Sequence, residues 1–218
     1  IVTTGMVTKK ILERYGSFPK EQIEVGCALR FESLHNLSLL KGRKDSNLNF
    51  VLLVAFGGSE EEIPLLNYSL GQAFLNKDII FRMRTHPIFS WNQLMSLSSW
   101  RKEIPENVGN STSFEVSDDL EICDAVLYLG TTVALESLMV GKPIIHFDRG
   151  DLLNFDPLFE FTDFKWQVQA KDSLQTVIQE IQALPETLYN EHQQQGIKYM
   201  KEYFYPVKNE NLEKFLHT

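Results

Sequence analysis

Short apolar segments, separated by polar turns, recur along most of the chain. Residues 50–56 form an uninterrupted apolar run, which is the pattern of a strand covered on both faces within a parallel sheet. Other apolar segments of strand length are bounded by turn-forming residues in the same way. The predicted strands are residues 23–25, 50–56, 79–83, 114–116, 125–129, 143–147 and 164–168.

Helical segments alternate with these strands. In residues 7–15, for example, Val7, Ile11 and Leu12 share one face and charged residues take the other. The alternation predicts an α/β fold, a Rossmann-like, doubly wound parallel sheet with helices on both faces, followed by a C-terminal helical tail. The other predicted helices are residues 34–40, 59–75, 88–97, 132–141, 173–184, 186–203 and 211–217, and residues 41–49 are predicted to be a loop.

The composition narrows the classes of function. A formal net charge of −8 over 218 residues argues against general nucleic-acid binding, which needs a basic surface. Cys27 and Cys123 stand in mostly apolar surroundings, so buried free thiols and a reducing, cytoplasmic location are expected. No apolar run is long enough to span a bilayer, and no cluster of residues has the spacing of metal ligands.

Ligands of open parallel sheets bind just beyond the carboxyl ends of the strands, where three loops of this chain stand out. The first is Gly57-Gly58-Ser59. Its glycines allow a ligand close to the backbone, and Ser59 is placed to cap a helix whose first N–H groups favour anions. A plain tight turn is the alternative, and the glutamates at 60–62 weigh against a bare anion site.

The second loop begins at Arg84, and His86 stands two residues further on. An imidazole at a strand end can donate to a phosphate oxygen or take up a proton near neutral pH. Arg84 is expected to reach a ligand, whereas Arg82 is expected to be paired. A surface histidine in a turn is the alternative for His86.

The third loop, residues 130–136, is the strongest local signal. Gly130 allows a sharp turn, and the hydroxyls of Thr131 and Thr132 lie at the start of a helix. Glu136 follows Thr132 by four residues and therefore shares its face of the helix, where a carboxylate can accept two ribose hydroxyls. The alternative is a capped helix with an exposed glutamate. Asp148 and Arg149, after a later strand, are candidates to line the same cleft. The alternative is that these charges are simply solvated.

Together, these loops and residues 124–145 resemble the C-terminal half of GT-B-fold glycosyltransferases. The resemblance is closest to bacterial surface-carbohydrate types and to the related glycerophosphate-polymer transferases and UDP-sugar 2-epimerases. Residues 26–30 look like the crossover from the N-terminal domain of such enzymes, and the resemblance spans roughly residues 25–147. It is specific for the fold and poorly specific for the substrate.

The resemblance also implies roles for individual residues. His86 contacts a phosphate and takes the catalytic role, and Glu136 holds the ribose. Residues 116–119 lie near the base. The remaining residues of the donor site are Gly57, Gly58, Ser59, Arg84, Thr131, Thr132 and Arg30. No cofactor or metal is expected beyond the nucleotide-sugar substrate, because helix N-termini and cationic side chains stabilise the leaving phosphate in such enzymes.

The resemblance divides the chain into residues 1–25 as a crossover from an N-terminal domain, 26–170 as the nucleotide-binding domain and 171–218 as helices that pack on it or cross back. Complete enzymes of this kind have two such domains. The chain is therefore expected to be the donor half of a longer glycosyltransferase, inactive alone, with the carbohydrate acceptor on the other domain. Peripheral membrane association of the full enzyme is compatible with this. The alternatives are a UDP-sugar 2-epimerase-like isomerase and a non-catalytic module whose helical tail docks a partner.

Overall fold

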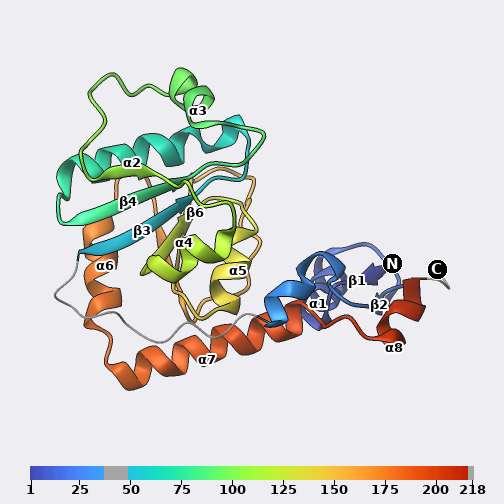
Figure 1. Cartoon of the computed structure of the whole chain (residues 1–218). Helices are drawn as coiled ribbons and strands as arrows, with labels where there is room; N and C mark the ends of the chain where they lie inside the picture. The colour runs from blue at the N-terminus through green and yellow to red at the C-terminus, as the bar shows by residue number, and fades with distance from the viewer. Residues whose placement is uncertain (37–48, 216–218) are drawn as a thin grey trace.

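The computed structural model describes residues 1–36 and 49–215. Its centre is a six-stranded, entirely parallel sheet with the strand order β5-β4-β3-β6-β7-β8 (Figure 1). The strands are β3 (Phe50–Ala55), β4 (Ile79–Arg84), β5 (Val108–Asn110), β6 (Ala125–Tyr128), β7 (Ile144–Phe147) and β8 (Lys165–Val168). The helix predicted at residues 34–40 and the loop predicted at 41–49 lie largely outside the described residues.

The predicted α/β fold is confirmed, and five of the six strands of its sheet lie where the apolar runs placed them. The strand predicted at residues 114–116 is wrong. The structure places the edge strand earlier, at β5, and helix α4 begins at Val116. The carbonyls of residues 113–115 accept hydrogen bonds from Arg84, so this segment is held by a side chain and not by a neighbouring strand.

Helices cover both faces of the sheet. One core contains Leu52, Val54 and Leu127 from the sheet and the apolar faces of α2 and α6. The other contains the alternate strand residues Leu53 and Val126, together with α5 and α7. Alternate residues therefore enter opposite cores, as the two-residue period of a strand requires. The helices are α1 (Met6–Tyr15), α2 (Ile63–Leu75), α3 (Trp91–Leu97), α4 (Val116–Ile122), α5 (Val133–Met139), α6 (Leu174–Ala183), α7 (Glu186–Tyr203) and α8 (Asn209–Leu212).

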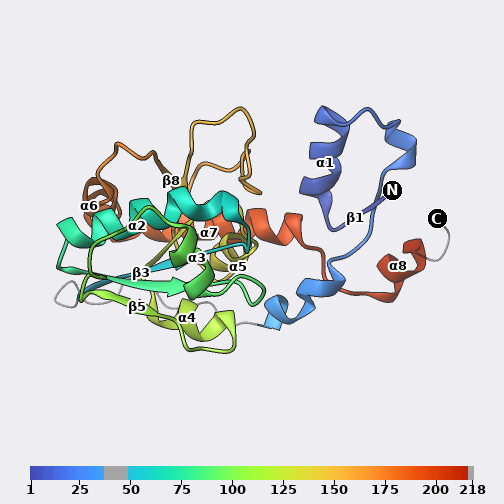
Figure 2. The same ribbon diagram turned by 90° about the horizontal axis from the view of Figure 1, so that it is seen from above.

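A smaller unit lies beside the sheet domain, and Figures 1 and 2 show α7 running from one to the other. In it, β1 (Val2–Thr3) pairs with β2 (Glu24–Val25), and α1 packs near the end of α7. The chain after α7 joins this unit, because the N–H of Tyr205 donates to the Thr4 carbonyl at 2.8 Å. No helix in the described residues is both long and apolar enough to cross a membrane.

Candidate functional site

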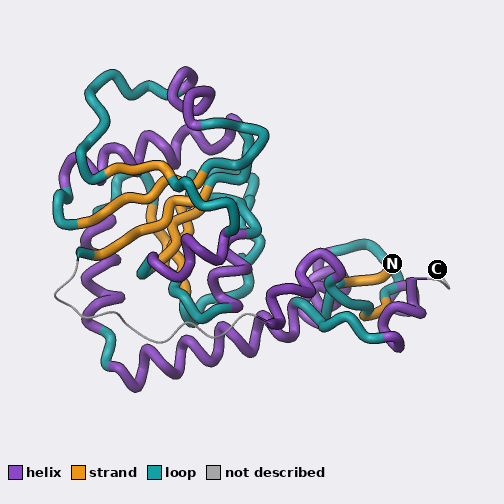
Figure 3. The backbone as a smooth tube through the Cα atoms, in the orientation of Figure 1, coloured by secondary structure: helices purple, strands orange, loops and turns teal. Residues whose placement is uncertain are grey.

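The strand order reverses between β3 and β6, which places a switch point at the centre of the sheet. From β3 the chain proceeds outward through β4 to β5, and then returns to β6 and proceeds the other way. Figure 3 shows the strands fanned side by side with loops at their ends. In such sheets the crevice that receives a ligand opens outside the carboxyl ends of the strands on either side of this point.

Strand register brings the three predicted loops to one level. Ala55 is the Cα partner of both Arg84 on β4 and Tyr128 on β6. Two residues beyond each of these partners stand Gly57, His86 and Gly130. A Cβ built on Gly57 would lie 3.4 Å from the Gly130 carbonyl oxygen, so the first and third loops are in contact.

Gly58 and His86 form the contact between the first and second loops. Gly58 has φ +93°, and a Cβ there would lie 2.7 Å from Cγ of His86, so only glycine fits. The His86 Nδ1 accepts the N–H of Ile88 at 3.3 Å. That bond assigns the ring proton to Nε2, which is therefore the nitrogen that can donate to a ligand.

The N–H groups of the glycine loop are already bonded to a carboxylate of the same chain. Glu62 is only 2% exposed, and its oxygens accept the Gly57 N–H at 2.5 and 2.6 Å and the Gly58 N–H at 3.0 Å. Burial raises the pKa of Glu62, and the N–H groups at residues 57–59 oppose that rise. The expected cap from the Ser59 side chain is wrong, because that side chain makes no capping bond and Glu62 satisfies the loop instead.

Arg84 holds the loop before α4. Its guanidinium pairs with the fully buried Asp119 at 2.5 Å and donates to the carbonyl of Phe114 at 3.0 Å and to those of Ser113 and Glu115 at 3.2 and 3.3 Å. Arg82 also pairs with Asp119, as the sequence predicted for it. Arg84 therefore holds residues 113–115, which directly precede residues 116–119, the segment that the resemblance places near the nucleobase.

The start of α5 supplies hydroxyls and a carboxylate. Thr131 is buried and its Oγ1 accepts the N–H of Val133 at 3.4 Å, whereas Thr132 is partly exposed. Burial raises the pKa of the Glu136 carboxyl, while Arg84 and Arg30 lower it and Glu115 raises it further. These charges reach Glu136 from β4, from the short helical segment that contains Arg30 and from the loop before α4, so they share one electrostatic environment. Arg30 itself is exposed, with its guanidinium over the ring of Phe31.

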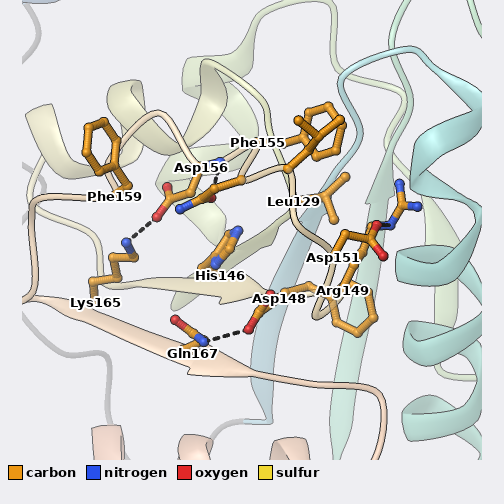
Figure 4. Close-up of a pocket in the computed structure, with 13 residues that line it drawn as sticks. Leu129, His146, Asp148, Arg149, Asp151, Phe155, Asp156, Phe159, Lys165 and Gln167 are labelled. Carbon is orange, nitrogen blue, oxygen red and sulfur yellow. Dashed lines mark hydrogen bonds and ion pairs between the residues drawn. The ribbon is translucent and has the colours of Figure 1, made fainter. Parts of the chain in front are cut away.

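A polar pocket lies beside this switch point, at the ends of β6, β7 and β8 (Figure 4). Its volume is about 200 Å³, and its lining contains none of the nine residues predicted to form the site. Asp148 and Arg149, which the sequence offered as cleft residues, do line it. The polar lining residues are His146, Asp148, Arg149, Asp151, Asn154, Asp156, Lys165 and Gln167.

The loop after β7 separates the pocket from the third predicted loop. A Cβ on Gly130 would lie 2.9 Å from both Cβ and O of Phe155, so this loop covers part of the β6 end. Burial lowers the pKa of His146, which is only 6% exposed. His146 is hydrogen-bonded to the backbone at Leu129, as expected for a core histidine.

Sequence reasoning missed the hydrogen bonds and ion pairs of Glu62, Asp119, Asp156 and Lys165. Each is a charged residue whose partner comes from another part of the chain or from a loop turned back on itself. For Glu62 the sequence offered one signal, an acidic residue shortly after two glycines at a strand end. The same pattern is equally typical of a helix whose first glutamates are solvated. Within the described residues, no three histidine, cysteine, aspartate or glutamate side chains gather as a metal site. The expected absence of a metal step stays a prediction.

No protein-family model and no curated protein matches the sequence, but solved structures match the fold. A glycosyltransferase from Rickettsia africae aligns with 99% of this chain and 61% of its own, at 15% identity and a TM-score of 0.60. The glycosyltransferase SnogD from Streptomyces nogalater aligns with 99% of this chain and 57% of its own, at 17% identity and a TM-score of 0.54.

A third match is the UDP-GlcNAc 2-epimerase from Neisseria meningitidis, solved bound to UDP-GlcNAc. It aligns with 99% of this chain and 60% of its own, at 13% identity and a TM-score of 0.57. The chain thus spans less than two thirds of the length of each of these proteins. With its six parallel strands, its central switch point and helix α7 running to the smaller unit, the chain has the Rossmann-like fold of the C-terminal half of a GT-B glycosyltransferase.

Proposed function

We propose that this chain is the donor-binding half of a glycosyltransferase, and that it holds a nucleotide-sugar at the switch point between β3 and β6. The observation that carries the proposal is the register: Gly57, His86 and Gly130 each stand two residues beyond strand positions that are paired across the sheet. Three loops whose residues suit phosphate or ribose binding thus meet at the place where parallel sheets bind ligands.

Each part of the ligand has a matching group in this arrangement. The Nε2–H of His86 and the hydroxyl of Thr132 face the phosphate, where they stabilise negative charge on the leaving group. Glu136 accepts the ribose hydroxyls, and residues 116–119, which follow the loop held by Arg84, lie beside the base. Gly57 and Gly58 serve as close-packed backbone rather than as N–H donors, because Glu62 occupies their N–H groups.

The finer parts of the proposal follow from the sequence resemblance. The acceptor is a surface carbohydrate bound mainly by another domain, the enzyme works in the cytoplasm, and no metal takes part in the chemical step. Arg30 reaches the cleft from the crossover, which is supported by its electrostatic effect on Glu136.

Calorimetric titration of the chain tests the proposal directly. We expect one of CMP, CDP, UDP, GDP and ADP to bind with a dissociation constant in the micromolar-to-millimolar range, about −4 to −8 kcal/mol in free energy. The chain alone is expected to show no sugar transfer. If every nucleotide is silent at millimolar concentration, the proposed donor site does not exist.

Replacing Glu136 tests the ribose contact. Glu136→Ala is expected to weaken binding of the preferred nucleotide about tenfold or more, because hydrogen bonds to a charged group contribute about 1.5–3 kcal/mol. The 2′-deoxynucleotide should lose much less on the same replacement. Glu180→Ala, an exposed glutamate on α6, is the matched control. Equal affinities of wild type and Glu136→Ala would remove the ribose role from this residue.

A second candidate function is a UDP-sugar 2-epimerase-like isomerase, favoured by the structural match to the Neisseria meningitidis enzyme. The two functions share the donor site and differ in what happens to the sugar. Product analysis of the full-length protein with a nucleotide-sugar separates them: a free nucleotide plus a new glycosidic bond indicates transfer, whereas an epimerised sugar indicates isomerisation.

A further inference from the structure

The glycine loop, residues 57–59, binds a carboxylate of the same chain. Both oxygens of the Glu62 carboxylate accept the Gly57 N–H, and one also accepts the Gly58 N–H, which is the arrangement of an ionised carboxylate. At 2% exposure the side chain is enclosed by protein, so solvent does not compete for these bonds. The contact is short in sequence, four to five residues, and belongs to the fold of the loop itself.

Without Glu62, the same N–H groups would be available to an additional phosphate at the switch point. Gly57 lies against the Gly130 turn, and Gly58 against the His86 ring, so an anion placed between the first two loops has the glycine N–H groups beside it. Glu62 already accepts hydrogen bonds from these N–H groups, and its carboxylate places a negative charge beside them. Like charges in such proximity disfavour each other, and more strongly where burial limits screening.

Two cations at this edge, Arg84 and Arg149, do not offset that charge. Arg84 is paired with Asp119, and Arg149 is paired with both Glu61 and Asp151. Arg30 is exposed and acts on the Glu136 carboxylate, so it belongs to the ribose side of the proposed site. The donors proposed to face the phosphate are then the Nε2–H of His86 and the hydroxyl of Thr132. These two groups suit the oxygens of one phosphate.

We infer that Glu62 restricts the ligand of this site to a single phosphate, so that the donor is a sugar linked through a nucleoside monophosphate rather than a diphosphate. The inference rests on the proposed function and names its substrate class. Glu62 acts as a specificity-determining residue: it touches the loop and not the ligand, and it removes the loop as a site for a second phosphate.

Calorimetry with matched pairs of nucleotides tests this: CMP against CDP, UMP against UDP, GMP against GDP and AMP against ADP. For the base that binds, we expect the wild-type chain to hold monophosphate and diphosphate within about threefold of each other, because the second phosphate gains no hydrogen bond. In Glu62→Gln the charge is gone and a bidentate acceptor is lost. The diphosphate should then gain about tenfold over the monophosphate, the value of a hydrogen bond to a charged group.

Two further variants serve as controls for Glu62→Gln. Glu60→Gln changes an exposed glutamate of the same turn and should keep the wild-type ratio. Glu62→Asp keeps the charge and should also keep that ratio, whether or not it lowers stability. Circular dichroism establishes that each variant is folded before titration.

The outcomes separate the inference from the proposed function. A wild-type chain that prefers the diphosphate tenfold or more overturns the inference and leaves the donor site intact. An unchanged ratio in folded Glu62→Gln also overturns it, because some other group then sets the preference. Silence with all eight nucleotides removes the proposed function and the inference together.

Discussion

Asp119→Ala is expected to lower the free energy of unfolding by about 3–5 kcal/mol, the usual cost of removing one partner from a buried ion pair. Asp119 has no exposed surface and accepts from Arg82 and Arg84 at 2.5 Å each, and from the Ser111 hydroxyl at 2.6 and 2.8 Å. Its loss leaves two largely buried guanidinium groups beside each other. Urea unfolding measures the change.

The same replacement should weaken nucleotide binding, because Arg84 holds the carbonyls of residues 113–115 only while Asp119 fixes its guanidinium. Asp118→Ala, at the exposed neighbouring position, serves as control and should change stability by no more than about 0.5 kcal/mol. A loss below about 1 kcal/mol for Asp119→Ala would contradict the paired geometry.

The pH dependence of stability gives an independent check on Asp119. Burial by itself would raise the pKa of its carboxyl, but Ser111, Arg82 and Arg84 together lower it below the ordinary value of 3.8. A lowered pKa means that the stabilisation is present above the unfolded-state value and disappears as pH falls through the folded-state value. The stability difference between wild type and Asp119→Asn should therefore hold from neutral pH to about pH 5 and shrink below pH 4.

Asp156→Ala is expected to cost a similar 3–5 kcal/mol at the wall of the polar pocket. The Asp156 side chain is 2% exposed and pairs with Lys165, whose side chain is 9% exposed. It also accepts the hydroxyl of Tyr128 at 2.7 Å and the N–H of Leu158 at 2.9 Å. Alanine leaves a buried ammonium group and a buried phenol without this acceptor. Thermal and urea unfolding report the loss.

A double variant distinguishes the ion pair from simple packing. Asp156→Ala combined with Lys165→Met should lose clearly less stability than the sum of the two single variants, because the double variant leaves no unpaired charge. Asp163→Ala, at an exposed position nearby in sequence, is the control. Strictly additive losses would show that Lys165 and Asp156 do not depend on each other.

Much of the fold could be predicted from the sequence because its central strands are buried on both faces. Such strands are continuous apolar runs, so residues 50–56, 125–129 and 143–147 identified β3, β6 and β7 to within two residues. The edge strand β5 is different. Only Val108 of its three residues is apolar, and it becomes a strand by pairing with β4, which no local pattern reveals.

For the candidate site, the sequence by itself determined which loops follow strands and which of them carry glycine, hydroxyl, histidine and carboxylate groups. Only the tertiary structure decided how they are used. Strand order and register bring Gly57, His86 and Gly130 to one level, and folding of the loop turns Glu62 inward onto the glycine N–H groups. Arg84 is drawn to Asp119, 35 residues away in sequence. The physical reason is that a buried charge must find a partner, and the partner available is set by packing between elements rather than by the residues next to it.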